Sequence, residues 1–397
     1  MSFYLLFKVL FSRKVVTGLL LLQLAMTLAL LLNSILLAKQ THQQLNQPTG
    51  LDVDNTLLVQ LKPTMASLRV YPALEELLNR QLDAVQAMPG VIAAAYTNQS
   101  AILQGGNNGN VYIDGEEDRT NQPSVPMYFV SKDFFNVLNS DVLQGELPQH
   151  SVSLDNPVQP DVVITKSLAD KLFAGKPAVG RQLNRGRVAA VISDFYGQRH
   201  GTNIMFNNIQ VAPPYSVDWG YGILLRVQPG QAENVRQQVD KVLRNVEPNI
   251  EILHVRTLAE QYQRLYRNEY GLATLLALLS ALMLLVTMVS SYSSTHFHAL
   301  KRQQEIGVKR ALGASKKVIF LELLSENWLC TAIGALFGIG CALLLNKALS
   351  QVITIPALDL YLPLLASLIL LVCVTVATWY PAAIATRISP ATATKAL

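Results

Sequence analysis

The sequence predicts an α-helical membrane protein with four transmembrane helices and one large α+β extracytoplasmic domain. Three observations predict this fold class. Charged residues make up only 15% of the 397 residues, against about 25% in an average soluble domain. The apolar residues gather in four charge-free blocks. A long polar segment between the first two blocks alternates between patterns typical of strands and of amphipathic helices.

Each apolar block is long enough to form a membrane-spanning helix. A helix rises about 1.5 Å per residue, so about 20 apolar residues cross a hydrocarbon core of ~30 Å. A charge at the centre of a bilayer costs roughly 2.5–3.5 kcal/mol on the insertion scale, which makes uncharged blocks of this length characteristic of spans. The charge-free blocks are residues 15–37, 270–292, 327–345 and 360–386.

The first block is expected to be an uncleaved anchor. A signal peptide has an apolar region of about 7–15 residues followed by a cleavage site of small residues. This block is longer, and Lys39, Gln40 and Thr41 follow it without such a site. The preceding residues 1–14 fit either an amphipathic helix on the cytoplasmic surface or a simple extension of the first span.

Basic residues set the expected orientation, because Lys and Arg concentrate on the cytoplasmic side of spans. They precede the first block, fill residues 301–317 and follow the fourth block, whereas the segment between the third and fourth blocks has only Lys347. Both termini are therefore expected in the cytoplasm. The net charge of +5 follows from this flanking pattern, so no nucleic-acid partner is expected.

The outer segment is expected to contain two β-α-β halves plus an inserted, mainly β subdomain. A strand–helix–strand pattern occurs near its start and again near its end, and together the two units predict one α/β subdomain. Between them, short β-like runs and one short helix at residues 167–173 are expected. The two patterns cover residues 56–61, 71–88 and 91–96, and then residues 222–227, 231–246 and 250–255.

These expectations divide the chain into consecutive segments. The three cysteines lie inside the spans, so the outer domain is expected to fold without disulfides. The expected order is a cytoplasmic amphipathic segment (1–14), the first span (15–38), the extracytoplasmic domain (39–268, with the α/β subdomain and stalk at 39–96 and 220–268 and the insert at 97–219), the second span (269–292), a cytoplasmic coupling loop (293–317), the third span (318–346), a short outer loop (347–359), the fourth span (360–386) and a cytoplasmic tail (387–397).

The most specific motif lies in the loop between the second and third spans. Residues 301–315 read KRQQEIGVKRALGAS. The pattern predicts a short helix that Gly313 ends in a left-handed conformation. This run resembles the corresponding loop of FtsX/MacB-type permeases, which carry R-x-x-E-I-G-x-x-x-A-x-G-A. The resemblance covers nearly the whole chain in the family's order and spacing, through residues 134–147, 161–173 and 179–181, Glu326, Gly334 and Gly338, and residues 380–382 and 388–390.

The resemblance implies a multi-pass permease of the bacterial cytoplasmic (inner) membrane without a fused ATPase. It implies a cytoplasmic ABC ATPase dimer, and a second copy or a homologous permease, as partners. A periplasmic adaptor, an outer-membrane duct and membrane lipid are further candidate partners. ATP hydrolysis would drive conformational change of the outer domain and thereby efflux or export of a peptide, macrolide-like or other envelope substrate. Lipoprotein release, or FtsX-like signalling that activates an envelope enzyme, are the alternatives.

The resemblance also assigns residues to roles. The Ile306 side of the loop helix is expected to enter a groove of the ATPase. Gly334 and Gly338 are spaced for close helix packing, while Glu322 and Glu326 fit either water-facing groups or pairs within the bundle or near the loop. The ATPase-coupling residues are Glu305, Ile306, Gly307, Arg310, Leu312, Gly313 and Ala314.

No catalytic, cofactor or metal site is expected in this chain. The sequence contains no G-x-x-x-x-G-K-[ST] motif, so ATP and Mg²⁺ are expected on the partner ATPase. The outer histidines are scattered, and His296 and His298 do not share a helix face. The acidic run at residues 114–118 lacks the ligand spacing of a calcium loop and is expected to be solvated.

Overall fold

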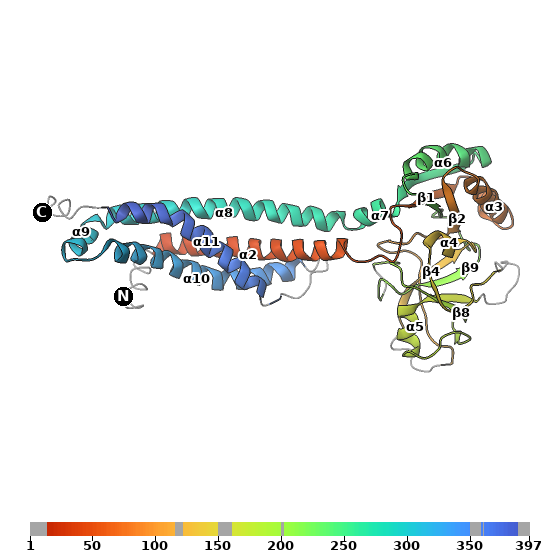
Figure 1. Ribbon diagram of the computed structural model, residues 1–397, viewed down its shortest axis with the longest axis horizontal. Coiled ribbons are helices and arrows are strands. Elements are labelled where there is room, and N and C mark those ends of the chain that lie inside the picture. Colours follow the sequence, from red (N-terminus) through yellow and green to blue (C-terminus); the bar gives the residue numbers. More distant parts are fainter. Residues whose placement is uncertain are drawn as a thin grey trace. The chain divides into compact units, whose positions relative to one another are not determined.

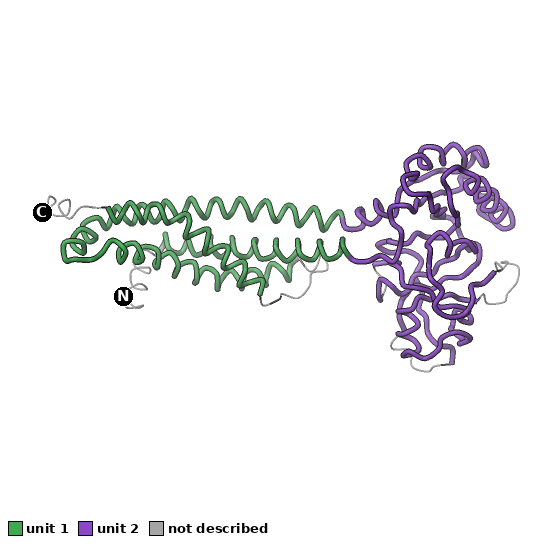
Figure 2. Tube along the Cα trace, viewed as in Figure 1, with its two compact units in different colours: residues 1–46, 267–397 green, residues 47–266 purple. Residues whose placement is uncertain are grey.

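The computed structural model describes residues 14–115, 122–149, 161–199, 202–349, 359 and 361–387. The chain divides into two compact units (Figure 2). Residues 1–46 and 267–397 form the helical unit, and residues 47–266 form the α/β unit. The predicted N-terminal amphipathic helix, most of the loop at 347–359, residues 116–118 of the acidic run and the tail after residue 387 lie outside the described residues.

The helical unit confirms the four expected spans. Four described helices are long and apolar enough to cross a membrane. Three of them have 32 to 35 residues, which at 1.5 Å per residue is roughly 50 Å and exceeds a ~30 Å hydrocarbon core. These three helices therefore continue beyond the hydrocarbon. The four are α2 (Lys14–Leu45), α8 (Arg267–Lys301), α10 (Lys316–Leu349) and α11 (Tyr361–Ala385).

On helix α8, mostly small residues face the inside of this bundle and most leucines face outward. Helix α2 packs against α8 and α10, and α11 packs against the same two helices (Figure 1). On α8 the buried stripe includes Ala273, Ser280 and Ser291, whereas Leu278 is 66% exposed. Lipid tails are as apolar as leucine, so close approach through small residues holds such helices together.

Hydrogen bonds between side chains and neighbouring helices add to this packing. In hydrocarbon such bonds contribute about 0.6 kcal/mol on average and fix the rotation of one helix against another. They connect α2 with α8, α2 with α10, and α8 with α10. The pairs are Thr27 with Thr287 (Oγ1 to Oγ1, 2.9 Å), Asn33 with Ala342 (Nδ2 to O, 3.2 Å) and Asn327 with Thr295 (Nδ2 to Oγ1, 3.1 Å).

The α/β unit is built on one long mixed sheet. The strand order is β11-β1-β10-β2-β4-β9-β6-β8-β5, with β3 paired to β4 and β7 to β8. The strands are β1 (Thr56–Pro63), β2 (Val91–Thr97), β3 (Asn108–Asn110), β4 (Ser124–Val130), β5 (Val142–Gly145), β6 (Val162–Thr165), β7 (Gln182–Leu183), β8 (Gly186–Ile192), β9 (Asn208–Val211), β10 (Tyr221–Val227) and β11 (Ile250–Thr257).

The first half of this sheet confirms the two expected β-α-β units. Strand β1 of the first unit pairs with both β10 and β11 of the second, so the units interleave and share one core. Helices α3 (Ala73–Gln86) and α6 (Ala232–Val246) contribute Leu78 and Val239 to that core, where they join Val59 of β1. This interleaving explains why the two ends of a long segment build one α/β layer.

The inserted half contains one helix more than expected. Helix α5 (Lys166–Phe173) was predicted, but α4 (Phe134–Leu138) was not. Four of the five α4 residues are buried, and such a short apolar run shows no periodicity that separates helix from strand. The remaining described helices are η1 (Ala66–Arg69), α7 (Leu258–Leu265) and α9 (Gln303–Ala311).

Candidate functional site

The loop between α8 and α10 forms the expected short helix and the expected glycine stop. Gly313 follows α9 with a φ of +96°, a conformation that residues with a Cβ adopt at a penalty of about 1–2 kcal/mol. Its amide donates to the Arg310 carbonyl at 3.1 Å. A Cβ built at Gly313 would meet nothing within 4 Å. The position therefore requires glycine for its backbone conformation and not for space.

Ile306 faces the interior of the helical unit. Its side chain is 5% exposed and packs in a cluster with Ile319 and Leu323 of α10 and Ala382 of α11. This differs from the expectation that the Ile306 side enters a groove of a partner. The neighbouring Gly307 is also buried. Ile306 and Gly307 therefore dock α9 onto its own bundle.

The outward surface of α9 and its C-terminal cap carries different apolar residues. Val308 is 53% exposed and Leu312 is 83% exposed, and the Glu305 side chain is 69% exposed. Leu312 and Glu305 were singled out from the sequence, but Val308 was missed. Residues that are two positions apart point about 200° apart around the helix axis. Because Ile306 is buried, Val308 faces the opposite side. We define Glu305, Val308 and Leu312 as the outer face of α9.

Two ion pairs join this loop to the first turns of α10. Arg302 donates from an Nη1 atom to Glu326 Oε1 at 2.6 Å, with only 16% and 11% of the two side chains exposed. Lys309 Nζ contacts Glu322 Oε1 at 2.7 Å, and here the lysine is 46% exposed. Both glutamates therefore pair with the loop, which is one of the two interpretations that the sequence allowed. Arg302 is the arginine of the R-x-x-E-I-G motif, but it was not among the predicted coupling residues.

Gly334 and Gly338 lie where α10 meets α2 of the same chain. A Cβ at Gly334 would be 2.7 Å from Leu24 Cβ. One at Gly338 would be 2.8 Å from Leu28 Cβ and 2.9 Å from the Ala25 carbonyl oxygen. Contacts below 3 Å force a shift of the neighbour, so the two glycines allow the close approach that their spacing predicts. That approach is within one chain.

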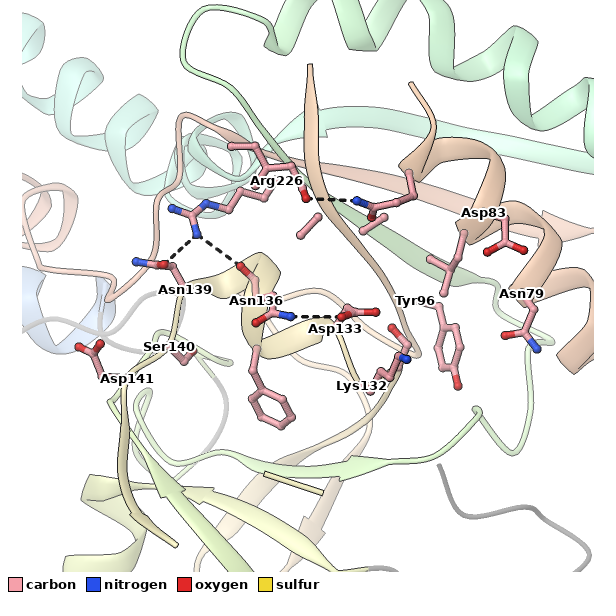
Figure 3. Close-up of a pocket in the computed structure, with 17 residues that line it drawn as sticks. Asn79, Asp83, Tyr96, Lys132, Asp133, Asn136, Asn139, Ser140, Asp141 and Arg226 are labelled. Atoms are coloured by element: carbon pink, nitrogen blue, oxygen red, sulfur yellow. Dashed lines mark hydrogen bonds between the residues drawn. The ribbon is translucent and has the colours of Figure 1, made fainter. Parts of the chain in front are cut away.

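A polar cleft of about 910 Å³ separates the two halves of the α/β unit (Figure 3). One wall comes from α3, β2 and β10, and the other from α4 and its flanking residues. Arg226 of β10 reaches across it and donates to Asn139 Oδ1 at 2.8 Å and to the Asn136 carbonyl at 3.4 Å. Asp133 in turn accepts from Asn136 at 3.1 Å. We call this the bridged cleft.

Sequence reasoning missed the bridged cleft because its residues come from segments far apart in the chain. Asn79, Tyr96, Asp141 and Arg226 all line it, and no spacing rule relates these positions. Beside the cleft, β2 pairs with β4 through a single described residue pair, Thr97 with Val130. This short ladder, the Arg226 bridge and side-chain hydrogen bonds from Asn98 and Gln99 to the backbone of β4 connect the two halves.

The sequence matches two protein-family models. The model of the MacB-like periplasmic core domain matches residues 17–242, which is more than half of the chain. The model of the FtsX-like permease C-terminal domain matches residues 277–390. The first match covers most of the α/β unit and the second covers most of α8 to α11.

Curated relatives and solved structures are similar at low identity. The macrolide export ATP-binding/permease protein MacB of Chromobacterium violaceum is 24% identical over 246 residues, 60% of this chain and 38% of that protein. The uncharacterized ABC transporter permease YvrN of Bacillus subtilis is 21% identical over 254 residues, 60% of this chain and 61% of that protein. The pyoverdine export ATP-binding/permease protein PvdT of Pseudomonas putida is 24% identical over 199 residues, 47% and 30% of the two chains.

The chain therefore spans less than two thirds of the length of each of these relatives. Among solved structures, the periplasmic region of MacB from Actinobacillus actinomycetemcomitans is 14% identical. The match covers 56% of this chain and 97% of that one, with a TM-score of 0.35.

Proposed function

The chain belongs to the family of ABC transporter permeases that join a MacB-like periplasmic core domain to an FtsX-like permease domain, and we propose that it transmits ATP hydrolysis on a separate ATPase dimer to its α/β unit. The outer face of α9 binds the ATPase. Movement of α9 then passes into α8 and α10. Both termini and α9 lie in the cytoplasm in this proposal, as the Lys and Arg distribution favours.

The observation that carries the proposal is the combination of a fixed helix with an exposed apolar surface. Buried Ile306 and the Arg302–Glu326 pair hold α9 against the bundle. Leu312 is nevertheless 83% exposed beside Val308. A short helix that presents apolar side chains to a partner groove is a common recognition mode. Because α9 is attached rigidly, a force on its outer face reaches α10 without being absorbed in a flexible loop.

The bridged cleft supports movement at the receiving end. Its two walls belong to different halves of the α/β unit, and beside it β2 and β4 share a single described ladder pair, Thr97 with Val130, next to the Arg226 bridge. Domain closure about a short connection is a frequent mode of conformational change. We propose that the two halves rotate about the β2–β4 connection when the partner hydrolyses ATP.

Export is the proposed outcome of this movement. Two of the relatives are named for export of a macrolide or of pyoverdine, and the model of the MacB-like periplasmic core domain matches this chain. We propose that a second permease copy or a homologous permease completes the complex. A periplasmic adaptor and an outer-membrane duct would then carry the substrate onward.

Reconstitution with the ATPase that co-purifies from native membranes tests the coupling role. Leu312→Asp places a charge in the proposed contact, and Gly313→Val disturbs the turn that follows α9. Each should weaken ATPase capture at least about tenfold, the scale of an interface anchor. Ile306→Asp should instead destabilise the helical unit.

Leu143→Asp is the matched control, because Leu143 is similarly apolar and 48% exposed but lies on β5. Binding is measured on nanodiscs, together with ATP turnover. Capture and turnover by the Leu312 and Gly313 variants that equal those of the unmodified chain would show that α9 is not the coupling element.

A further inference from the structure

A second cleft of the α/β unit has a volume of about 600 Å³, and none of the described residues that line it carries a charged side chain. It lies among β1, the residues that follow β2, the loop before β10, β11 and α7. We call it the neutral cleft. It contrasts with the bridged cleft, which is lined by several carboxylates and two basic residues. Its amide side chains are Gln60, Asn98, Gln99, Asn107 and Gln261.

Two exposed aromatic side chains stand at the neutral cleft. Trp219 is 92% exposed and Tyr215 is 61% exposed. The loop that carries them is fixed, since Val217 is 1% exposed in the core of the α/β unit. Gly220 follows with a φ of +91°, and a Cβ there would lie 2.4 Å from the Leu61 carbonyl oxygen. An indole held in the open on a rigid loop adds little to folding, but it offers a flat apolar face to a ligand.

The floor of the cleft is preorganised by its own amides. Gln99 Oε1 accepts from the Asn107 amide at 2.7 Å and from Gln198 Nε2 at 2.8 Å. Gln99 Nε2 donates to the carbonyls of Asn107 and Met127, each at 3.1 Å. A Cβ at Gly106 would lie 2.4 Å from Gln99 Oε1, so this glycine keeps the floor in place. A fixed floor lowers the entropy lost when a ligand binds.

Two polar atoms at this cleft lack a partner among the described residues. They are Ser100 Oγ, in a residue only 2% exposed, and His254 Nε2. A buried polar atom without a hydrogen bond is unfavourable, and a ligand hydroxyl would satisfy it. Burial, followed by the charges of Arg256 and Arg264, lowers the pKa of His254 to about 4. The ring is therefore uncharged at neutral pH, and a neutral imidazole can both donate and accept.

We propose that the neutral cleft binds an uncharged oligosaccharide, with one sugar ring stacked on Trp219 and its polar groups hydrogen-bonded to Ser100, His254 and the side-chain amides of Gln60, Asn107 and Gln261. A sugar ring has an apolar C–H face and an edge of hydroxyl groups, which match an exposed indole beside amides. A cationic ligand would lose its water shell here without gaining an opposite charge from the described lining residues, and Arg256 and Arg264 nearby would repel it. The site does not depend on ATP coupling, so binding is expected with this chain alone.

Equilibrium dialysis of the full chain in nanodiscs tests the proposal. The probes are triacetylchitotriose, which is uncharged, and its deacetylated trimer, which has the same length but carries amine cations. The acetylated trimer should bind at one per chain, and the cationic trimer at least about tenfold more weakly. Trp219→Ala should weaken binding of the acetylated trimer about tenfold, as expected for a lost aromatic contact.

Leu143→Ala serves as the control, since Leu143 is exposed in the same unit but does not line the cleft. It should bind the acetylated trimer as the unmodified chain does. The third probe is a trialanine peptide blocked at both ends. Binding of this peptide but not of the acetylated trimer would assign the cleft to peptides and overturn the proposal. The proposal is also overturned if the acetylated trimer does not bind, or if its binding is unaffected by Trp219→Ala.

Discussion

Leu312 and Ile306 lie six positions apart and have opposite environments. Ile306 is 5% exposed and packs against α10 and α11, whereas Leu312 is 83% exposed. Both are apolar residues in one short basic segment, so the sequence pattern alone assigned both to the partner. Burial separates them into a residue that fixes α9 and a residue that is available for contact. Substitution of Ile306 should therefore destabilise the helical unit, whereas substitution of Leu312 should weaken binding of the ATPase.

His254 gives a prediction about pH at the same scale. Its pKa is lowered to about 4 in the folded chain, while an unfolded histidine titrates near 6.5. Above about pH 6.5 both states are neutral and no effect arises. As the pH falls from about 6.5 to about 4, the unfolded chain takes up a proton that the folded chain does not, so stability is lost in this window.

His254→Gln should remove that part of the pH dependence. The measurement is the unfolding midpoint of the α/β unit, monitored by circular dichroism of the full chain at several pH values from 7 to 4. The difference between the unmodified chain and the variant isolates His254 from the other titrating groups. If the difference in unfolding midpoint between the two chains stays constant from pH 7 to 4, His254 is not held neutral by the fold.

At the scale of elements, long periodic segments were predictable and short ones were not. Helices α3 and α6 agree with their predicted ranges to within a few residues. The four spans also lie where they were predicted, but α2 and α8 end several residues later than expected. The spans extend further because α2, α8 and α10 continue into polar residues that remain helical. Helix α4 was missed because five mostly apolar residues fit either a helix or a strand. Its position depends on burial against the sheet, which is a tertiary effect.

The glycines of α10 give a graded prediction. Gly338→Ala should destabilise the α2–α10 contact most, because its Cβ would lie 2.9 Å from a backbone oxygen that cannot move aside easily. Gly334→Ala should cost less, since the nearest atoms belong mainly to the Leu24 side chain. Overpacking of this kind typically costs about 1–3 kcal/mol.

Gly340→Ala is the control within the same helix, because a Cβ there meets nothing within 4 Å. The measurement is thermal unfolding of the chain in one detergent at fixed concentration. Equal effects of all three substitutions would indicate that helix propensity, and not contact with α2, determines the outcome.

The two ion pairs of the loop are expected to differ in strength. Arg302 and Glu326 are both mostly buried, and removing one partner of a buried pair costs about 3–5 kcal/mol. The Lys309–Glu322 pair has a half-exposed lysine and should contribute less than about 1 kcal/mol.

Single alanine substitutions measure the cost of removing one partner, and double-mutant cycles measure the coupling energy of each pair. Hydrogen exchange of the α9 amides provides the local readout. Faster exchange is expected for the Arg302 and Glu326 variants than for the Lys309 and Glu322 variants. The reverse order would contradict the assignment of Arg302–Glu326 as the contact that holds α9.

At the scale of the whole chain, the family, the spans and the α/β core followed from sequence patterns, whereas the clefts did not. Arg226 illustrates the reason. It lies on β10 and meets Asn139 only because the sheet brings distant segments together. Trp219 likewise gave no sequence signal, because its near-complete exposure is visible only in the folded loop. The periodicity of apolar residues indicates which face of one helix or strand is buried. It does not predict a surface that several elements form together.

In the proposed coupling, α9 transmits ATP hydrolysis to the two halves of the α/β unit. Its most direct test is the distance across the bridged cleft. Spin labels are attached to cysteines placed at Asn79 and Asp141, which are exposed and line opposite walls, in a chain whose three native cysteines are replaced. Double electron–electron resonance then measures the distance between the two labels in nanodiscs, with the ATPase present, before and during ATP turnover.

The proposed coupling predicts that the label separation changes by more than about 2 Å during turnover, the scale of a domain rearrangement. The change should vanish in the Leu312→Asp variant while the resting distance stays the same. A separation that is identical with and without turnover in the unmodified chain, although the ATPase is bound and active, would contradict it.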